Sequence, residues 1–276
     1  MSITKFTCLF AMLGLTCLAP TAKGVTLVSS VQPYVAQTGW VSTDTRNTGV
    51  NATTQALVDT RVQFTAGPAG SNGSVNLITP ASNDKATVAY VDTNGLGGLS
   101  GFTASYRWLK TSVGAAAPAL KLGLQTTQYP AAASARIGEN NWDKVLVYEP
   151  YGNSVGNPPD NVWVTESITA ATGKWSLFDR NTSTSHQLPL NGLTITQWFS
   201  DATYGALLTG AEIVDVQVGQ GSGNPGTDGY VDWMQTSVLN GGELVDFVAI
   251  PEPASLALAG SAALGLFVVR RRRLSV

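Results

Sequence analysis

Short runs of apolar or alternating residues, separated by clusters of Gly, Asn, Pro and Asp, fill the middle of the chain. In residues 102–108 apolar side chains alternate with polar ones, the period of two expected of a strand with one buried face. The β-branched residues of 212–218 also favour a strand. The clearest runs are 57–64, 86–91, 102–109, 119–126, 144–148, 162–169, 174–178, 211–218 and 229–238. Because no long amphipathic helix interrupts them, they predict an all-β domain, an antiparallel sandwich of two sheets.

Two stretches are less regular. Residues 25–83 are richer in Ser, Thr, Asn and Gly than the rest, and we expect them to supply the first strands of the same domain, joined by long loops. Residues 193–204 show no clear period, and a short helix is one interpretation of them.

The N-terminal 24 residues predict a signal peptide. Lys5 supplies one positive charge ahead of thirteen mostly apolar residues at 6–18. Small residues, Ala22 and Gly24, then occupy the two positions that signal peptidase reads. We therefore expect export of the chain and cleavage near Gly24.

The C-terminal 27 residues have three parts. The first is the triplet Pro251, Glu252 and Pro253, and the second is an uncharged stretch at 254–269. The last is the basic cluster Arg270, Arg271, Arg272 and Arg273. The sixteen residues of 254–269 would span about 24 Å as a helix, and snorkelling arginines help such a helix cross a bilayer. The positive charges place the C-terminus in the cytoplasm and the sandwich on the outer side.

This three-part tail resembles the PEP-CTERM sorting signal. The resemblance implies recognition by an exosortase, cleavage near the triplet, and delivery to the cell envelope or extracellular matrix of a Gram-negative bacterium that makes exopolysaccharide and biofilm. An ordinary tail anchor is the alternative, with the same topology but no processing. The chain then divides into a signal peptide (1–24), a sandwich (25–249) and a sorting signal with its membrane helix (250–276).

The middle of the chain has a looser resemblance. Residues 141–150, Trp163, Trp175 and residues 228–233 look like parts of secreted jelly rolls of the concanavalin-like or carbohydrate-binding-module type. The resemblance rests on strand rhythm and aromatic placement, and it implies a jelly-roll sandwich.

Charge excludes one class of partner. Residues 25–249 hold seventeen acidic and ten basic side chains, a net charge of −7 that the C-terminal arginines conceal in the total of −2. Because an acidic body without a basic stripe repels phosphate backbones, we expect no binding of nucleic acid.

Few residues in the sequence suggest catalysis. Cys8 and Cys17 both lie in the signal peptide, and His186 is the single histidine of the chain, so a zinc site or a catalytic triad is not expected. Glu139, Asp143 and Glu149 are the nearest group of carboxylates, but a turn at 140–141 interrupts them. A carbohydrate-active enzyme, a glycoside hydrolase or lyase, needs a carboxylate pair in a cleft and is therefore the alternative rather than the prediction.

One loop has the composition of a calcium site. Asn224, Asp228 and Asp232 offer hard oxygen ligands in a Gly-rich segment. A structural calcium ion is the one cofactor that we consider, and an ordinary Asx-rich turn is the competing interpretation.

The seven tryptophans are the remaining feature of the sequence that suggests a function. Most should fill the core between the sheets, but a Trp ring on the surface can stack on a sugar. Trp142, Trp163 and Trp198 each lie beside polar or loop-forming residues, so we expect their rings to be exposed. The sequence thus predicts a non-catalytic surface or matrix protein that associates with exopolysaccharide.

Overall fold

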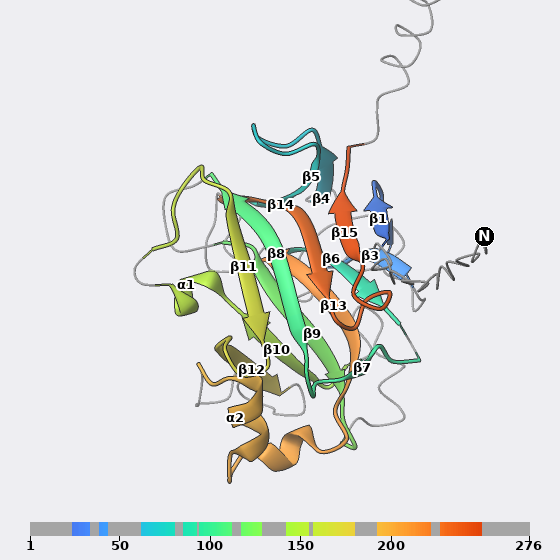
Figure 1. Cartoon of the computed structure of the whole chain (residues 1–276), viewed down its shortest axis with the longest axis vertical. Coiled ribbons are helices and arrows are strands. Elements are labelled where there is room, and N and C mark those ends of the chain that lie inside the picture. The colour runs from blue at the N-terminus through green and yellow to red at the C-terminus, as the bar shows by residue number, and fades with distance from the viewer. Residues whose placement is uncertain are drawn as a thin grey trace, which may run out of the picture.

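The computed structural model describes residues 24–33, 39–43, 62–80, 85–92, 94–111, 117–128, 142–154, 157–179, 192–221 and 227–249. Within these ranges two β-sheets pack face to face, sheet A in front of sheet B in the view of Figure 1. The predicted signal peptide, apart from Gly24, and the tail at 250–276 lie outside the described residues. Among the helices that the structure describes, none is long and apolar enough to cross a membrane.

Sheet A has a ten-residue strand, β14, at its centre. Strand β8 pairs along one edge of β14, while β5 and β15 share the other edge. Strand β11 lies outside β8, β4 outside β5, and β1 outside β15, where the pairing is parallel. The seven strands are β1 (Val25–Val28), β4 (Val62–Thr65), β5 (Ser74–Thr79), β8 (Thr103–Lys110), β11 (Val164–Thr169), β14 (Thr227–Thr236) and β15 (Leu244–Phe247).

Sheet B has the order β12-β10-β9-β13-β6-β3-β2, and β7 pairs with the start of β13. Its strands are β2 (Gln32–Pro33), β3 (Gly39–Thr43), β6 (Ala86–Val91), β7 (Gly97–Gly98), β9 (Ala119–Gln125), β10 (Lys144–Tyr148), β12 (Trp175–Asp179) and β13 (Glu212–Gln220). The chain passes repeatedly from one sheet to the other, for example between β8 and β9 and between β13 and β14. The predicted two-sheet sandwich is confirmed.

Helical structure is limited to short pieces in the described ranges. Helix α1 (Pro150–Asn153) follows β10, and α2 (Ile195–Ser200) precedes the 3-10 helix η2 (Gly205–Leu208). Helix α2 begins with a capping box in which Thr194 and Gln197 satisfy each other's backbone N–H groups. The short-helix interpretation of residues 193–204 is confirmed.

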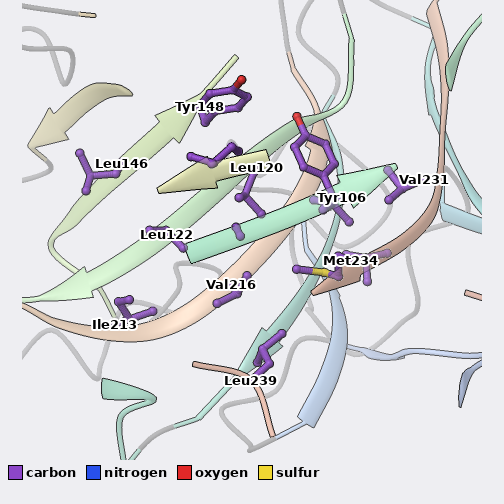
Figure 2. Packing of buried hydrophobic residues seen from close by; sticks show 14 of the residues in the cluster. Tyr106, Leu120, Leu122, Leu146, Tyr148, Ile213, Val216, Val231, Met234 and Leu239 are labelled. Atoms are coloured by element: carbon purple, nitrogen blue, oxygen red, sulfur yellow. The ribbon is translucent and has the colours of Figure 1, made fainter. Parts of the chain in front are cut away.

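The core lies between the two sheets, where side chains at alternate positions of each strand meet (Figure 2). From sheet A it receives Tyr106 and Met234, both completely buried, and from sheet B it receives Leu120, Leu122 and Val216. Removing such side chains from water is the main stabilising contribution, roughly 25 cal/mol per Å² of apolar area. The same alternation turns the intervening residues of β8 and β14 outward.

Candidate functional site

The outward face of sheet A carries aromatic and charged side chains together. Tyr106 and Trp108 of β8 enter the core, so Arg107 between them points outward. On β14, the register against β8 shifts between Val231 and Trp233, which makes Asp232 the extra residue of a β-bulge. The bulge turns Asp232 toward the face that carries Arg107.

Arg107 and Asp232 form an ion pair at the centre of this face. Arg107 Nη1 lies 2.6 Å from Asp232 Oδ2, and their side chains are 27% and 7% exposed. Ser71 Oγ donates a hydrogen bond to Asp232 Oδ1 at 2.7 Å. Arg107 Nη1 also donates to the carbonyl oxygen of Gly70 at 3.0 Å. Since both oxygens of the nearly buried carboxylate have donors, its desolvation is compensated.

Trp163 packs beside this ion pair with its ring held in place. Its Nε1 donates to the carbonyl oxygen of Ala69 at 3.0 Å, and Arg107 Cζ lies 4.9 Å from its ring centroid, within cation–π range. Gly70 has a φ of +94°, and a Cβ there would lie 3.4 Å from Trp163 Cδ1. The turn between β4 and β5 therefore contacts the ring closely, while the side chain stays half-buried.

Two further groups give the face its electrostatic character. The Cα of Asp246 pairs with that of Trp233, and burial together with the nearby Asp232 raises the pKa of Asp246 above its usual 3.8. Burial, with the charge of Asp228, raises the pKa of Tyr230. Like Trp163, the side chains of Tyr230 and Trp233 are half-buried. The face thus combines three partly exposed aromatic rings with the ion pair of Arg107 and Asp232 and the carboxylate of Asp246.

The structure contradicts the expected exposure of Trp142 and Trp198. Trp142 is 7% exposed and belongs to a separate buried cluster with Val145 and Val214. Trp198 is completely buried, and its Nε1 donates to the carbonyl oxygen of Trp175 at 2.9 Å. The polar neighbours of Trp198 misled the interpretation because α2 is amphipathic and turns them to solvent, whereas Ile195 and Trp198, three residues apart, point inward.

Asp228 and Asp232 of the predicted calcium loop are not brought together. Asn224 lies outside the described residues, while Asp228 and Asp232 both belong to β14. Four residues of extended strand place their Cα atoms about 13 Å apart, too far for one ion to bind both side chains. The carboxylate of Asp232 contacts Arg107 instead. Among the described residues no group of three or more His, Cys, Asp or Glu side chains has the arrangement of a metal site.

Asp143 and Glu149 of the predicted carboxylate group have different surroundings. Glu139 and His186 lie outside the described residues. Asp143 is buried, accepts from the N–H and hydroxyl of Thr126, and lies 2.7 Å from Lys144 Nζ. Asp179, on the neighbouring strand β12, lies 3.2 Å from the same nitrogen. Asp143 is therefore part of a buried charge cluster, while Glu149 stays exposed at the start of α1.

The sequence did not identify Arg107, Tyr230 or Trp233 as site residues. It assigned Asp232 to a calcium loop rather than to an ion pair. One signal was available for Arg107, because a charged residue at a non-core position of a regularly alternating strand must face outward. Its partner lies 125 residues away in the sequence, and no local pattern indicates such a contact.

Comparison with known proteins characterises the C-terminus. Residues 249–273 match the family model described as the PEP-CTERM protein-sorting motif. The chain carries a PEP-CTERM signal. This signal implies export, processing by an exosortase at the membrane, and a final location in the cell envelope or outside the cell. The match confirms the prediction made from Pro251, Glu252, Pro253 and the arginines at 270–273.

Solved structures are similar to this PEP-CTERM chain at low sequence identity. The family 11 carbohydrate-binding module of Clostridium thermocellum, in complex with a β-1,3-1,4-mixed-linked tetrasaccharide, has 13% identity and a TM-score of 0.38; the match covers 80% of this chain and 100% of that one. The exoplasmic/lumenal domain of VIP36 in its Ca²⁺-bound form has 8% identity and a TM-score of 0.32, with 80% and 96% covered. These similarities are too distant to identify a ligand. No curated protein sequence matches the chain.

Proposed function

We propose that this chain is an exosortase-processed surface or matrix protein of a Gram-negative bacterium, and that its sandwich binds exopolysaccharide without hydrolysing it. In this proposal signal peptidase removes residues 1–24, residues 25–249 form the binding domain, and residues 250–276 act as the sorting signal. The observation that carries the sugar-binding part is the fixed, half-exposed ring of Trp163 on the outward face of sheet A.

Stacking on a sugar requires an aromatic ring that is held before the ligand arrives. A hydrogen bond to Ala69 and the guanidinium of Arg107 both restrain the ring of Trp163, so little side-chain entropy is lost on binding. Polar groups beside a ring provide the hydrogen bonds that orient a sugar, and the ion pair of Arg107 and Asp232 lies beside the ring of Trp163. Trp233 and Tyr230 extend the aromatic surface across β14.

Charge narrows the class of glycan. Residues 25–249 carry a net charge of −7, so a strongly anionic polysaccharide would be repelled at close range. A neutral or cationic glycan is therefore the proposed ligand class.

Affinity electrophoresis or calorimetry against the host's own exopolysaccharide tests the proposal. Trp163→Ala should weaken binding about tenfold, which corresponds to about 1.4 kcal/mol, while Trp163→Phe should retain part of the affinity because it keeps a ring. Phe199→Ala is the matched control, because Phe199 is an aromatic residue that is 43% exposed on α2, in a different part of the molecule. Binding that Trp163→Ala leaves unchanged would contradict the site, and release of reducing sugar would replace the binding proposal with an enzyme.

A further inference from the structure

The first and the last strand of the described sandwich lie side by side. Strand β1 begins at Val25, the first residue after the predicted signal peptide, and β15 ends at Phe247, two residues before the sorting motif starts. The strands pair in parallel, Val25 opposite Leu244 and Val28 opposite Phe247. The N–H of Val248 continues the ladder by donating to the carbonyl oxygen of Val28 at 2.9 Å. The N-terminal segment therefore joins this edge of sheet A at the Val25 end of β1, and the sorting tail leaves it at the Phe247 end of β15.

This edge exposes apolar side chains. Val25 is 55% exposed and Leu27 is 65% exposed, the two highest values among the large hydrophobic residues that the structure describes. Their alternation on β1 places both on the face away from the core, since Val28 points into it. In the described ranges no strand pairs with the outer edge of β1. An exposed apolar edge strand is a liability unless something covers it.

The sorting tail sets how far this edge can lie from a membrane. From Ala249 to the start of the predicted membrane helix at residue 254 the fully extended chain reaches at most about 18 Å. The headgroup layer on one side of a bilayer takes up about 5 to 8 Å of that reach. While the tail is inserted, the end of β15 is thus held close to the lipid surface, and β1 is its immediate neighbour.

We propose that the β1–β15 edge of sheet A faces the bilayer while the sorting tail is anchored, and that Val25 and Leu27 rest in the lipid interface. The inference depends on the anchored tail and not on glycan binding, whose central residue, Trp163, precedes β11 at the opposite edge of sheet A. Tethering raises the local concentration of lipid at this edge, so two side chains suffice for a contact that the free domain would not make. Glu243 and Asp246 flank the apolar pair, so zwitterionic lipid fits this edge better than anionic lipid.

Site-specific fluorescence quenching tests this orientation. The exported form, residues 25–276 with the sorting tail intact, contains no cysteine and would carry Leu27→Cys labelled with an environment-sensitive dye. The matched control is Ser167→Cys, an exposed position on β11 at the opposite edge of sheet A. Both proteins are reconstituted into phosphatidylcholine vesicles with and without a lipid that carries a quencher, and only chains that float with the vesicles are measured.

We expect the lipid quencher to reduce the emission of the dye at residue 27 several-fold more than that of the dye at residue 167. Val25→Cys should behave like Leu27→Cys. Equal, weak quenching at both edges would overturn the proposal. A change in the emission of the dye at residue 27 that appears only after exosortase is added would also overturn it. The edge would then contact the enzyme rather than lipid. Chains that fail to float would contradict the anchored tail itself, and circular dichroism checks that each labelled variant is folded.

Discussion

Arg107 and Asp232 meet across two adjacent strands, β8 and β14, with 2.6 Å between Nη1 and Oδ2. The contact depends on the β-bulge, which turns Asp232 out of the regular alternation of β14. It also supports Trp163, because the same guanidinium lies against the indole ring. One ion pair therefore links the stability of sheet A to the proposed sugar site.

Removing one partner of this pair should be more harmful than removing both. Arg107→Ala leaves a nearly buried carboxylate without its cation, and we expect a loss of about 2 kcal/mol in the free energy of unfolding. The double variant Arg107→Ala/Asp232→Ala should regain part of that loss. Urea unfolding of the wild type, both single variants and the double variant measures the coupling. Strictly additive effects would show that the pair contributes no interaction energy.

Asp246 should make the domain less stable at neutral pH than it would be with a neutral side chain. Its folded-state pKa is raised above 3.8, so its protonated form stabilises the folded state. This contribution to the free energy of unfolding is fully present below pH 3.8 and is lost as the pH rises through the folded-state pKa. Asp246→Asn should therefore raise the urea midpoint at pH 7 relative to the wild type and change it little near pH 3. A midpoint difference that does not grow between pH 3 and pH 7 would refute this assignment.

Tyr106 and Tyr148 should ionise only when the domain unfolds. Burial is the main cause that raises both pKa values, and Glu166 adds to it; Tyr148 donates to this carboxylate at 2.9 Å. Since an exposed tyrosine ionises near pH 10, the protonated forms favour the folded state up to about that pH, and this contribution is lost as the pH rises further. An alkaline titration followed by phenolate absorbance and circular dichroism measures how many tyrosines ionise as the domain unfolds. That number should be one smaller for Tyr148→Phe than for the wild type.

Added calcium should not stabilise the domain through β14. Asp232 already pairs with Arg107, and Asp228 is four residues away on the same strand. A ligand raises stability only if it binds the folded state. Thermal unfolding with chelator and with millimolar calcium should give the same midpoint. A rise that Asp228→Asn abolishes would restore the loop at 224–232 as a calcium site.

The sorting triplet should decide whether the tail is removed. In a host that carries an exosortase, replacing Pro251, Glu252 and Pro253 with alanine should leave the precursor in the membrane fraction, whereas the wild type loses its tail. The matched control replaces residues of the domain surface, such as Thr165 and Ser167 on β11. Mass spectrometry of the secreted protein provides the measurement. An intact C-terminus in the secreted wild type would rule out exosortase processing.

Much of the strand pattern could be predicted from local sequence. The runs at 86–91 and 144–148 coincide with β6 and β10, because alternation and β-branched content are properties of neighbouring residues. The short strands β1 and β15 were not identified individually, since four residues carry too little periodicity. The parallel partner of β1 lies at the other end of the domain, and no pattern within either strand specifies that pairing.

The sequence by itself determined the class of fold and the sorting signal at 249–273, since both are written in short-range patterns that do not depend on distant residues. Only the tertiary structure decided which tryptophans reach the surface. Trp142 and Trp198 have polar neighbours but are buried, whereas Trp163 stays half-exposed beside Arg107. The physical reason is that a side chain's exposure depends on which strands, helices and turns pack over it, and these come from distant parts of the chain.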